Sequence, residues 1–394
     1  GLLGYTGLSF YARFLIVGLP GPELDDAARA WLAEFKPGGV LLQHQNVFTD
    51  WQTRDLITEV RYAVALGEER SDLPLFALAQ EGGPQANPLG IEDAPAAESL
   101  GRDAATKLAP ALDGTEPDEQ AIDEAVQPIR ETAARYGTLA KEWGMAVVFA
   151  PVLDVFQPDA SDPRLRDRTF GTDALRVHLC GEAFADGLLD SGVIPVVKHY
   201  PGLGAAQSGE DGALTIAEDD VQALANHIFL PFAMAADRQV PGILVAPVSV
   251  PALDRSGAPA SLSPRIAGAM LREMWDYKGV VVADEIPGMN PAEAFVGALV
   301  AGCDAYVVYN ADWNTLRDCA AALADAVASG KLAQARLDES RARLEQWQER
   351  LGGTPTRIEE TMLTQAGGEG EGEGQGEDTP APAVEAPAES PIPE

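Results

Sequence analysis

The sequence contains few cysteines and few histidines. Its 394 residues include only Cys180, Cys303 and Cys319 and only His44, His178, His199 and His227. Three scattered cysteines do not make a disulfide framework or a zinc site, and the histidines lack metal-ligand spacing. We therefore expect no metal and no other cofactor. The cysteines are interpreted as small core residues in a reducing, cytoplasmic environment.

Basic residues are also scarce. The chain has 28 Lys and Arg against 61 Asp and Glu, so its formal net charge is −33 at pH 7. Nucleic acids and anionic membrane surfaces are bound by basic patches, so this balance argues against both as partners. From Gly353 onward the sequence is mostly Gly and Glu, then Pro, Ala and Glu. Such a segment has almost nothing apolar to bury, and we expect 353–394 to be a disordered acidic tail.

Long apolar runs are absent. No run reaches the roughly 18 residues that a membrane-spanning helix needs, so we expect no membrane span. The apolar start, 1–21, is interrupted by glycines, Arg13 and Pro20. The first residue is not an initiating Met, which leaves open the removal of a leader.

Short apolar runs, in contrast, recur along the chain. Eight of them occur, at 14–19, 38–43, 73–80, 146–155, 193–200, 242–250, 279–286 and 304–310. They do not alternate with polar residues, which is typical of parallel strands covered on both faces. Helical patterns between them predict a single-domain α/β fold, a (β/α)8 TIM-like barrel over 1–352. A doubly wound open sheet is the alternative, but no GxGxxG follows the first run.

The helical stretches carry their own expectations. In 121–144 the apolar residues return to one face at steps of three, four and seven, and Pro128 is expected to kink this helix or mark its start. The last helix is predicted over 337–351 by the same kind of pattern. Residues 88–120 show no strand pattern and are interpreted as a long loop with a short helix, inserted after the third strand.

Polar residues follow the predicted strands. Glu81 follows the third strand, Asp154 the fourth, Lys198 and His199 the fifth, and Asp284 the seventh. In a barrel these strand ends meet at one rim, where catalytic residues collect. Cations and carboxylates that balance one another suit a polyhydroxylated neutral ligand such as a sugar. The competing interpretation is that these groups form structural ion pairs or cap a helix.

Several motifs occur in a familiar order. They are FLIVGLPGPEL, KPGGVLL, QEGG (80–83), FAPVLDV (149–155), DRTFGTD (167–173), VVKHYPGLG (196–204), PASLSP (259–264), GVVVADEI (279–286) and AGCDAYVV (301–308). Together they resemble the amino-terminal barrel domain of glycoside hydrolase family 3, in particular its single-domain β-N-acetylglucosaminidases. The resemblance covers about 14–350.

The resemblance implies a retaining hydrolase of β-linked glycosides with a carbohydrate substrate. Asp284 falls on the family's nucleophile, and Arg168, Lys198 and His199 fall on positions that bind sugar hydroxyls. A retaining enzyme needs an ionised nucleophile and a second group about 5 Å away that acts first as acid and then as base. We expect Lys198 and Arg168 to hold the pKa of Asp284 down.

Other family positions are altered. The acid/base triplet Asp-Ser-His on the loop after the fifth strand is replaced by Gly209, Glu210 and Asp211. Further replaced positions are Ala79 and Pro84 around the QEGG motif, Leu203 in the Pro-Gly-x-Gly turn, and Pro247 after the sixth strand.

Two functions are therefore weighed. One is a β-N-acetylhexosaminidase-like hydrolase in which Asp211 or Glu210 serves as substitute acid, once desolvation in a closed loop raises its pKa. The other is a catalytically inactive barrel that binds sugar or acts as a scaffold. The glycine-rich loop 202–211 is expected to be mobile and to hold Asp211 away from Asp284 in the unliganded protein. The oligomeric state is left open.

Overall fold

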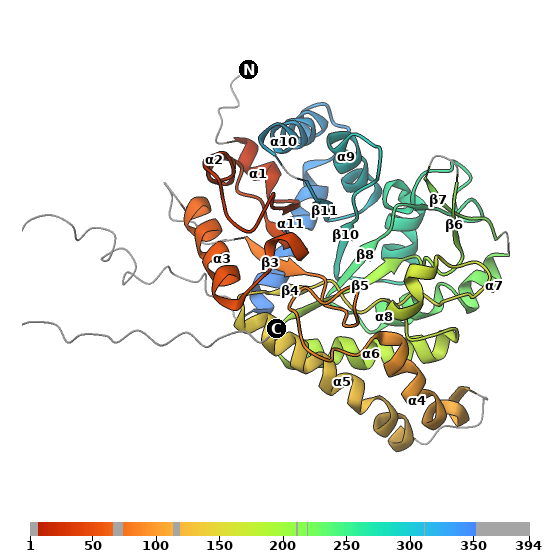
Figure 1. Ribbon diagram of the computed structural model, residues 1–394. Coiled ribbons are helices and arrows are strands. Elements are labelled where there is room, and N and C mark those ends of the chain that lie inside the picture. Colours follow the sequence, from red (N-terminus) through yellow and green to blue (C-terminus); the bar gives the residue numbers. More distant parts are fainter. Residues whose placement is uncertain are drawn as a thin grey trace, which may run out of the picture. The chain divides into compact units, whose positions relative to one another are not determined.

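Eight parallel strands close into a barrel, as predicted (Figure 1). They are β1 (Leu15–Gly18), β2 (Gly39–Leu42), β3 (Leu75–Leu78), β4 (Val147–Val148), β5 (Ile194–Tyr200), β8 (Gly242–Val245), β10 (Val280–Ala283) and β11 (Ala305–Val308). Each of the eight apolar runs supplies one of these strands. The pairing of β11 with β1 closes the barrel, which excludes the open doubly wound sheet.

This computed structural model describes residues 7–65, 74–112, 119–209, 212–218, 220–310 and 312–351. The predicted disordered tail, 353–394, lies outside the described residues. So do Glu210 and Asp211, the two residues proposed from the sequence as substitute acids.

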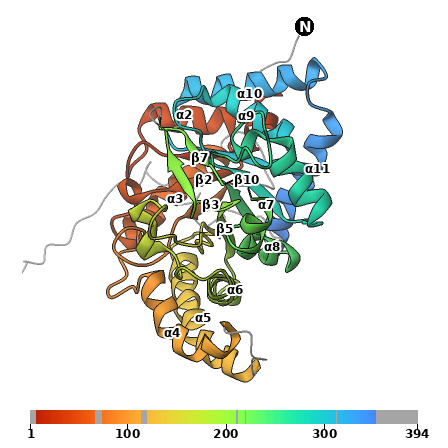
Figure 2. The same cartoon turned by 90° about the vertical axis from the view of Figure 1, so that its right-hand side faces the viewer.

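Helices surround the barrel (Figure 2). They are α1 (Leu8–Ala12), α2 (Asp26–Phe35), α3 (Asp50–Ala65), α4 (Ala97–Leu112), α5 (Glu119–Glu142), α6 (Ala174–Asp190), α7 (Val221–Asn226), α8 (Leu230–Asp237), a π-helix (Pro264–Met274), α9 (Pro291–Ala301), α10 (Trp313–Ala328) and α11 (Gln334–Arg350). Asp25, Asp173 and Asp312 precede three of them and cap them by accepting a backbone N–H. None of the described helices is long and apolar enough to cross a membrane.

One helix matches its prediction and one differs from it. α5 (Glu119–Glu142) corresponds to the helix predicted over 121–144, and Pro128 lies in its interior, which excludes Pro128 as its start. Ala125 and Ile129, on either side of the proline, are both buried, and α5 packs along α6, which offsets the roughly 3 kcal/mol cost of an interior proline. α4 is 16 residues long rather than short. Its buried Ala97, Ala104 and Leu108 recur at helical spacing, a pattern that the sequence analysis did not weigh.

The barrel interior determines where a site can form. Inward-facing side chains of the strands make a separate apolar cluster that includes Ile16, Val147, Val196, Val280 and Val282. Trp347 of α11 joins this cluster at the amino-terminal ends of the strands, where its indole N–H donates to the carbonyl of Pro241 at 3.0 Å. The described side chains therefore fill the base and middle of the barrel, and the opening is at the carboxyl ends of the strands.

The loop after β5 contains regular structure that the sequence did not reveal. β6 (Ala206–Ser208) and β7 (Leu214–Ile216) pair as an antiparallel hairpin, and β7 pairs with β9 (Val248–Ser249). Ile216 is fully buried and anchors the hairpin. The glycine-rich segment therefore includes a strand, while the predicted position and mobility of Asp211 stay predictions.

Candidate active site

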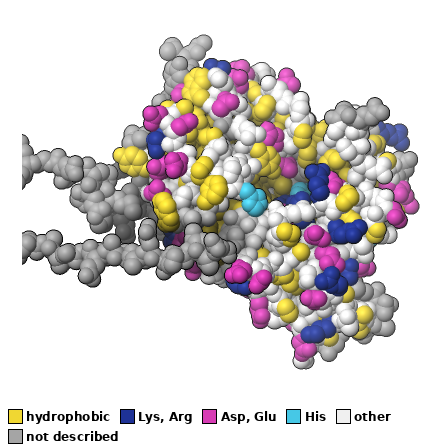
Figure 3. Space-filling model, viewed as in Figure 1, with side chains coloured by type: hydrophobic (Ala, Val, Ile, Leu, Met, Phe, Trp, Pro, Cys, Tyr) yellow, Lys and Arg dark blue, Asp and Glu magenta, His cyan; other side chains and the backbone are white. Residues whose placement is uncertain are grey.

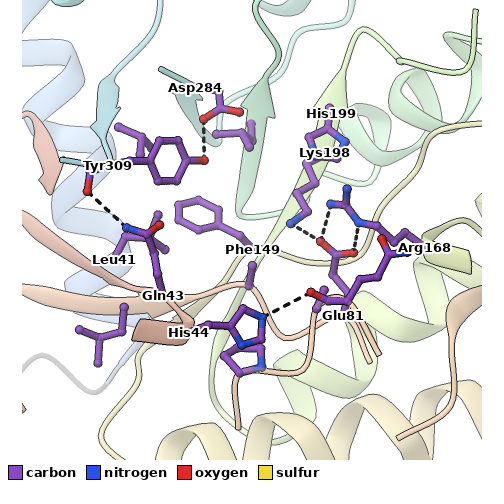
Figure 4. Close-up of a pocket in the computed structure, with 17 residues that line it drawn as sticks. Leu41, Gln43, His44, Glu81, Phe149, Arg168, Lys198, His199, Asp284 and Tyr309 are labelled. Carbon is purple, nitrogen blue, oxygen red and sulfur yellow. Dashed lines mark hydrogen bonds and ion pairs between the residues drawn. The ribbon is translucent and has the colours of Figure 1, made fainter. Parts of the chain in front are cut away.

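A cavity of about 350 Å³ opens at the carboxyl ends of the strands. Its floor is the top layer of the barrel interior, formed by Leu41, Phe149, Leu244 and Val307. Its polar wall contains Gln43, His44, Glu81, Gln85, Arg168, Lys198, His199, Asp284 and Tyr309 (Figure 4). All four sequence-predicted residues within the described part of the chain thus line one cavity, which confirms that they converge.

Glu81 organises the cationic side of the cavity. Gly82 and Gly83, with φ of 89° and 67°, form the turn that directly follows it. Its carboxylate accepts two hydrogen bonds from Arg168, at 2.7 and 2.8 Å, and forms an ion pair with Lys198. Although burial alone raises the pKa of the Glu81 carboxyl, Lys198 and Arg168 together lower it to about 2. Glu81 is therefore ionised, and it holds two cations side by side.

These cations retain unused donors. Lys198 uses one of its three N–H groups to contact Glu81. Arg168 contacts Glu81 through Nε and Nη2, so its Nη1 donates to no described residue. Burial lowers the pKa of Lys198, against the opposing effect of Glu81. The arrangement is both an ion pair and a source of hydrogen-bond donors at the cavity wall.

His199 is fixed by a second buried carboxylate. Asp154 is fully buried and accepts from His199 Nδ1 at 2.7 Å and from the backbone N–H of Leu203 at 2.7 Å. Because Asp154 accepts at Nδ1, Nε2 of the ring is left for a ligand. The structural interpretation of Lys198 and His199 as partners of carboxylates is thus correct, and the same side chains also face the cavity.

Asp284 lies on a different side of the cavity from Glu81 (Figure 4). It continues β10, and its backbone N–H donates to the carbonyl of Val245. The side chain accepts from the Tyr309 hydroxyl at 2.8 Å and from the backbone N–H of Glu285 at 3.0 Å. Both bonds reach Oδ1, and Oδ2 accepts none from the described residues.

The pKa expected for Asp284 is wrong in direction. Burial raises it above the ordinary value. The Tyr309 hydrogen bond and the neighbouring His199 and Lys198 oppose this effect only in part. Lys198 lowers the pKa of Asp284 too little to offset burial, and both Lys198 and Arg168 are paired with Glu81.

Tyr309 was missed by the sequence analysis. A signal for it exists, because inward-facing residues alternate along β11, and Tyr309 follows Ala305 and Val307 at steps of two. His44 lies at the cavity wall too, where Nε2 is 3.3 Å from the carbonyl of Gln85. Ala79, one of the positions altered relative to the family it resembles, also lines the cavity.

The described residues offer no metal site. Within them, no group of three or more His, Cys, Asp or Glu side chains is arranged to hold a metal ion. On the face drawn in Figure 3, acidic and basic side chains are interspersed rather than gathered into one basic patch.

The chain is similar to named β-hexosaminidases. It is 32% identical over 259 residues to beta-hexosaminidase LpqI of Mycobacterium tuberculosis, an alignment that covers 61% of this chain and 64% of that protein. It is 29% identical over 301 residues to a beta-hexosaminidase of Methylococcus capsulatus, with coverage of 74% and 81%. The chain thus spans somewhat less than two thirds of the length of the mycobacterial relative.

Solved structures agree with this similarity. A family 3 beta-N-acetylglucosaminidase from Paenibacillus sp. FPU-7 superposes with a TM-score of 0.73 at 26% identity, over 91% of this chain and 67% of that one. A beta-N-acetylhexosaminidase from Beutenbergia cavernae gives a TM-score of 0.71 at 25% identity, over 88% and 98%. Residues 14–346 match the family model described as the Glycosyl hydrolase family 3 N terminal domain. The chain therefore belongs to glycosyl hydrolase family 3.

Proposed function

We propose that this protein is a retaining glycoside hydrolase that acts on β-linked N-acetylhexosaminides or related O-glycosides, with Asp284 as nucleophile. The observation that carries this proposal is the open Oδ2 of Asp284 in a cavity whose other wall presents hydrogen-bond donors. The names of several similar proteins, which are β-hexosaminidases or a β-N-acetylglucosaminidase, support the same substrate class.

The cavity has the two surfaces that a sugar needs. Lys198, Arg168 and His199 have donors to spare for hydroxyl oxygens. Phe149 and the aliphatic floor offer an apolar surface to the C–H face of the ring. Because Glu81 and Asp154 hold the three polar side chains in place, little side-chain entropy is lost when the sugar binds.

The reaction follows the double displacement of retaining glycosidases. Asp284 attacks the anomeric carbon, the bond to the leaving-group oxygen breaks, and that oxygen takes up a proton. A covalent glycosyl ester on Asp284 results, and water cleaves it to release the sugar and regenerate the carboxylate. We propose Asp211 as the proton donor of the first step and the base of the second, because it is a carboxylate at the position of the family's acid/base triplet after β5.

A second candidate function has an observation in its favour. Ala79 lines the cavity at a position where the resemblance implies a sugar-binding carboxylate, and Gly209 and Asp211 replace the Asp and the His of the family's Asp-Ser-His triplet. A barrel with these replacements that retains Lys198 and His199 is a sugar-binding module without turnover.

Aryl β-glycosides of N-acetylglucosamine separate the two functions. A good leaving group needs little help from an acid, so the wild-type protein should release it, and Asp284→Asn should not. Asp211→Ala should slow only the hydrolysis of poor leaving groups. Asp312→Asn is the matched control, because Asp312 is exposed and only caps α10. Sugar binding by a wild-type protein that cleaves neither substrate class would establish the non-catalytic module instead.

A further inference from the structure

Both hydrogen bonds on the Asp284 carboxylate converge on one oxygen. The Tyr309 hydroxyl and the Glu285 backbone N–H donate to Oδ1, at 2.8 and 3.0 Å. A carboxylate held at one oxygen by two donors cannot rotate freely about its Cβ–Cγ bond. Its second oxygen then points in one direction, which is what an in-line attack on an anomeric carbon requires.

We propose that Tyr309 is a positioning residue that fixes the nucleophile and stabilises its carboxylate form, so that Asp284 attacks through Oδ2. This inference rests on the proposed function. Oδ2 becomes the ester oxygen bonded to the sugar, and Oδ1 becomes the ester carbonyl oxygen that faces the Tyr309 hydroxyl. No additional reactant is needed, because Tyr309 keeps its proton throughout.

Tyr309 is itself held from two sides. Its backbone N–H donates to Oε2 of Glu285 at 3.0 Å, and its backbone carbonyl accepts from Nε2 of Gln43 at 3.3 Å. The first bond ties β11 to the segment that carries Asp284, and the second ties it to the end of β2. The Tyr309 phenol is therefore held beside Asp284 by hydrogen bonds to two neighbouring strand ends of the barrel rim.

Electrostatics favour a tyrosine as this donor. Burial and the adjacent Asp284 raise the Tyr309 pKa well above its ordinary value, so the hydroxyl keeps its proton and donates a hydrogen bond to the carboxylate. Its donation stabilises the ionised carboxylate against the burial that raises the Asp284 pKa. The other charged or titratable groups that act on Asp284 are Lys198 and His199 from β5, Tyr306 from β11, and the neighbouring Glu285.

Tyr309→Phe tests the proposal because it removes only the hydroxyl. Rates are recorded against pH with an activated aryl glycoside, and active sites are titrated with a slow 5-fluoro glycosyl fluoride of N-acetylglucosamine. We expect kcat/KM to fall about tenfold or more, and its acid limb to move to higher pH because Asp284 ionises less readily. Tyr277→Phe is the matched control. Its hydroxyl donates to the carbonyl of Val240 before β8, so its loss should affect stability and leave the limb in place.

A spectroscopic measurement keeps the test independent of turnover. The carboxyl C=O stretching band of protonated Asp284 is isolated by subtracting the infrared spectrum of Asp284→Asn, and its titration is compared with and without the Tyr309 hydroxyl. The midpoint should rise in Tyr309→Phe. An unmoved midpoint, or an unmoved acid limb in an active enzyme, would overturn the positioning role. If the midpoint rises in Tyr309→Phe but the wild-type protein cleaves no glycoside, the proposed function is refuted and the hydrogen-bond role of Tyr309 stands.

Discussion

Asp284 and Asp304 lie at opposite ends of two neighbouring strands. Asp284 directly follows β10 and opens onto the cavity, whereas Asp304 directly precedes β11 and is fully buried. Asp304 accepts five hydrogen bonds, from Arg272, Arg336, Arg343, Ser340 and the backbone N–H of Val281, and these occupy both of its oxygens. Asp284 accepts two, both on Oδ1.

The difference distinguishes a structural carboxylate from the proposed nucleophile. Both oxygens of Asp304 accept hydrogen bonds, and three arginines compensate its charge. Asp304 therefore joins α11, the π-helix and β10 at the base of the barrel. Asp284 is placed among few partners and retains an oxygen for chemistry. Burial without full compensation raises the pKa of Asp284, a cost in stability that is typical of functional sites.

The largest expected effect is on activity. Asp284→Asn should lower kcat/KM for an aryl β-N-acetylglucosaminide by at least about 10³-fold, because the amide cannot act as the nucleophile. Its melting temperature should stay the same or rise, since the substitution removes a poorly solvated charge. Steady-state kinetics and a thermal melt check both parts. A variant that unfolds at a much lower temperature would show that Asp284 is as structural as Asp304.

Asp304→Asn should produce the opposite pattern. Removing this charge leaves Arg272, Arg336 and Arg343 without their common partner, and breaking such a buried pair costs about 3–5 kcal/mol of unfolding free energy. Urea denaturation measures that loss. At a temperature where the variant is folded, kcat/KM per active site should equal that of the wild type. A loss of catalysis in the folded variant would contradict the distinction between Asp304 as a structural residue and Asp284 as the proposed nucleophile.

Glu81 gives stability a defined pH dependence. Its folded-state pKa is about 2, below the reference value of 4.5, so its contribution is present above pH 4.5 and is lost as the pH falls toward 2. The difference corresponds to about 3 kcal/mol. Urea midpoints measured between pH 5 and 2 should therefore fall in the wild type. Glu81→Gln should already be less stable at pH 7, and its urea midpoints should fall less; equal slopes would contradict the assignment.

An exposed pair sets the lower end of the scale. Arg102 and Glu98 of α4 form an ion pair at 2.7 Å, and 62% of the Arg102 side chain is exposed. Arg102→Ala should change the unfolding free energy by less than about 0.5 kcal/mol because water screens the charges. A loss of unfolding free energy as large as that of Asp304→Asn would mean that burial does not explain the difference between the Arg102–Glu98 pair and the ion pairs of Asp304.

Much of the fold was readable from short apolar runs. Both the inward and the outward side chains of a barrel strand are mostly buried, so an apolar run such as Val280–Ala283 identifies a strand without any alternation. The extent of α4 was not predicted, because this helix depends on packing against α5 and α6. The hairpin of β6 and β7 depends on pairing with β9, a contact distant in sequence.

The site was predictable as a set of residues and less so as an electrostatic arrangement. Motifs located Asp284, Lys198, His199 and Arg168, and the barrel brought them together. The raised pKa of Asp284 comes mainly from its burial, and the sequence specifies neither that burial nor the pairing of both cations with Glu81. Tyr309 is recognisable only after the inward face of β11 is known.

Trapping the covalent intermediate tests the assignment of Asp284 most directly. The wild-type protein is incubated with the 5-fluoro glycosyl fluoride of N-acetylglucosamine, digested with a protease and mapped by mass spectrometry. We predict one added sugar per chain, attached to the peptide that contains Asp284, and no addition to Asp284→Asn. A sugar attached to another carboxylate, or no adduct in a protein that hydrolyses the activated aryl glycoside, would contradict Asp284 as the nucleophile.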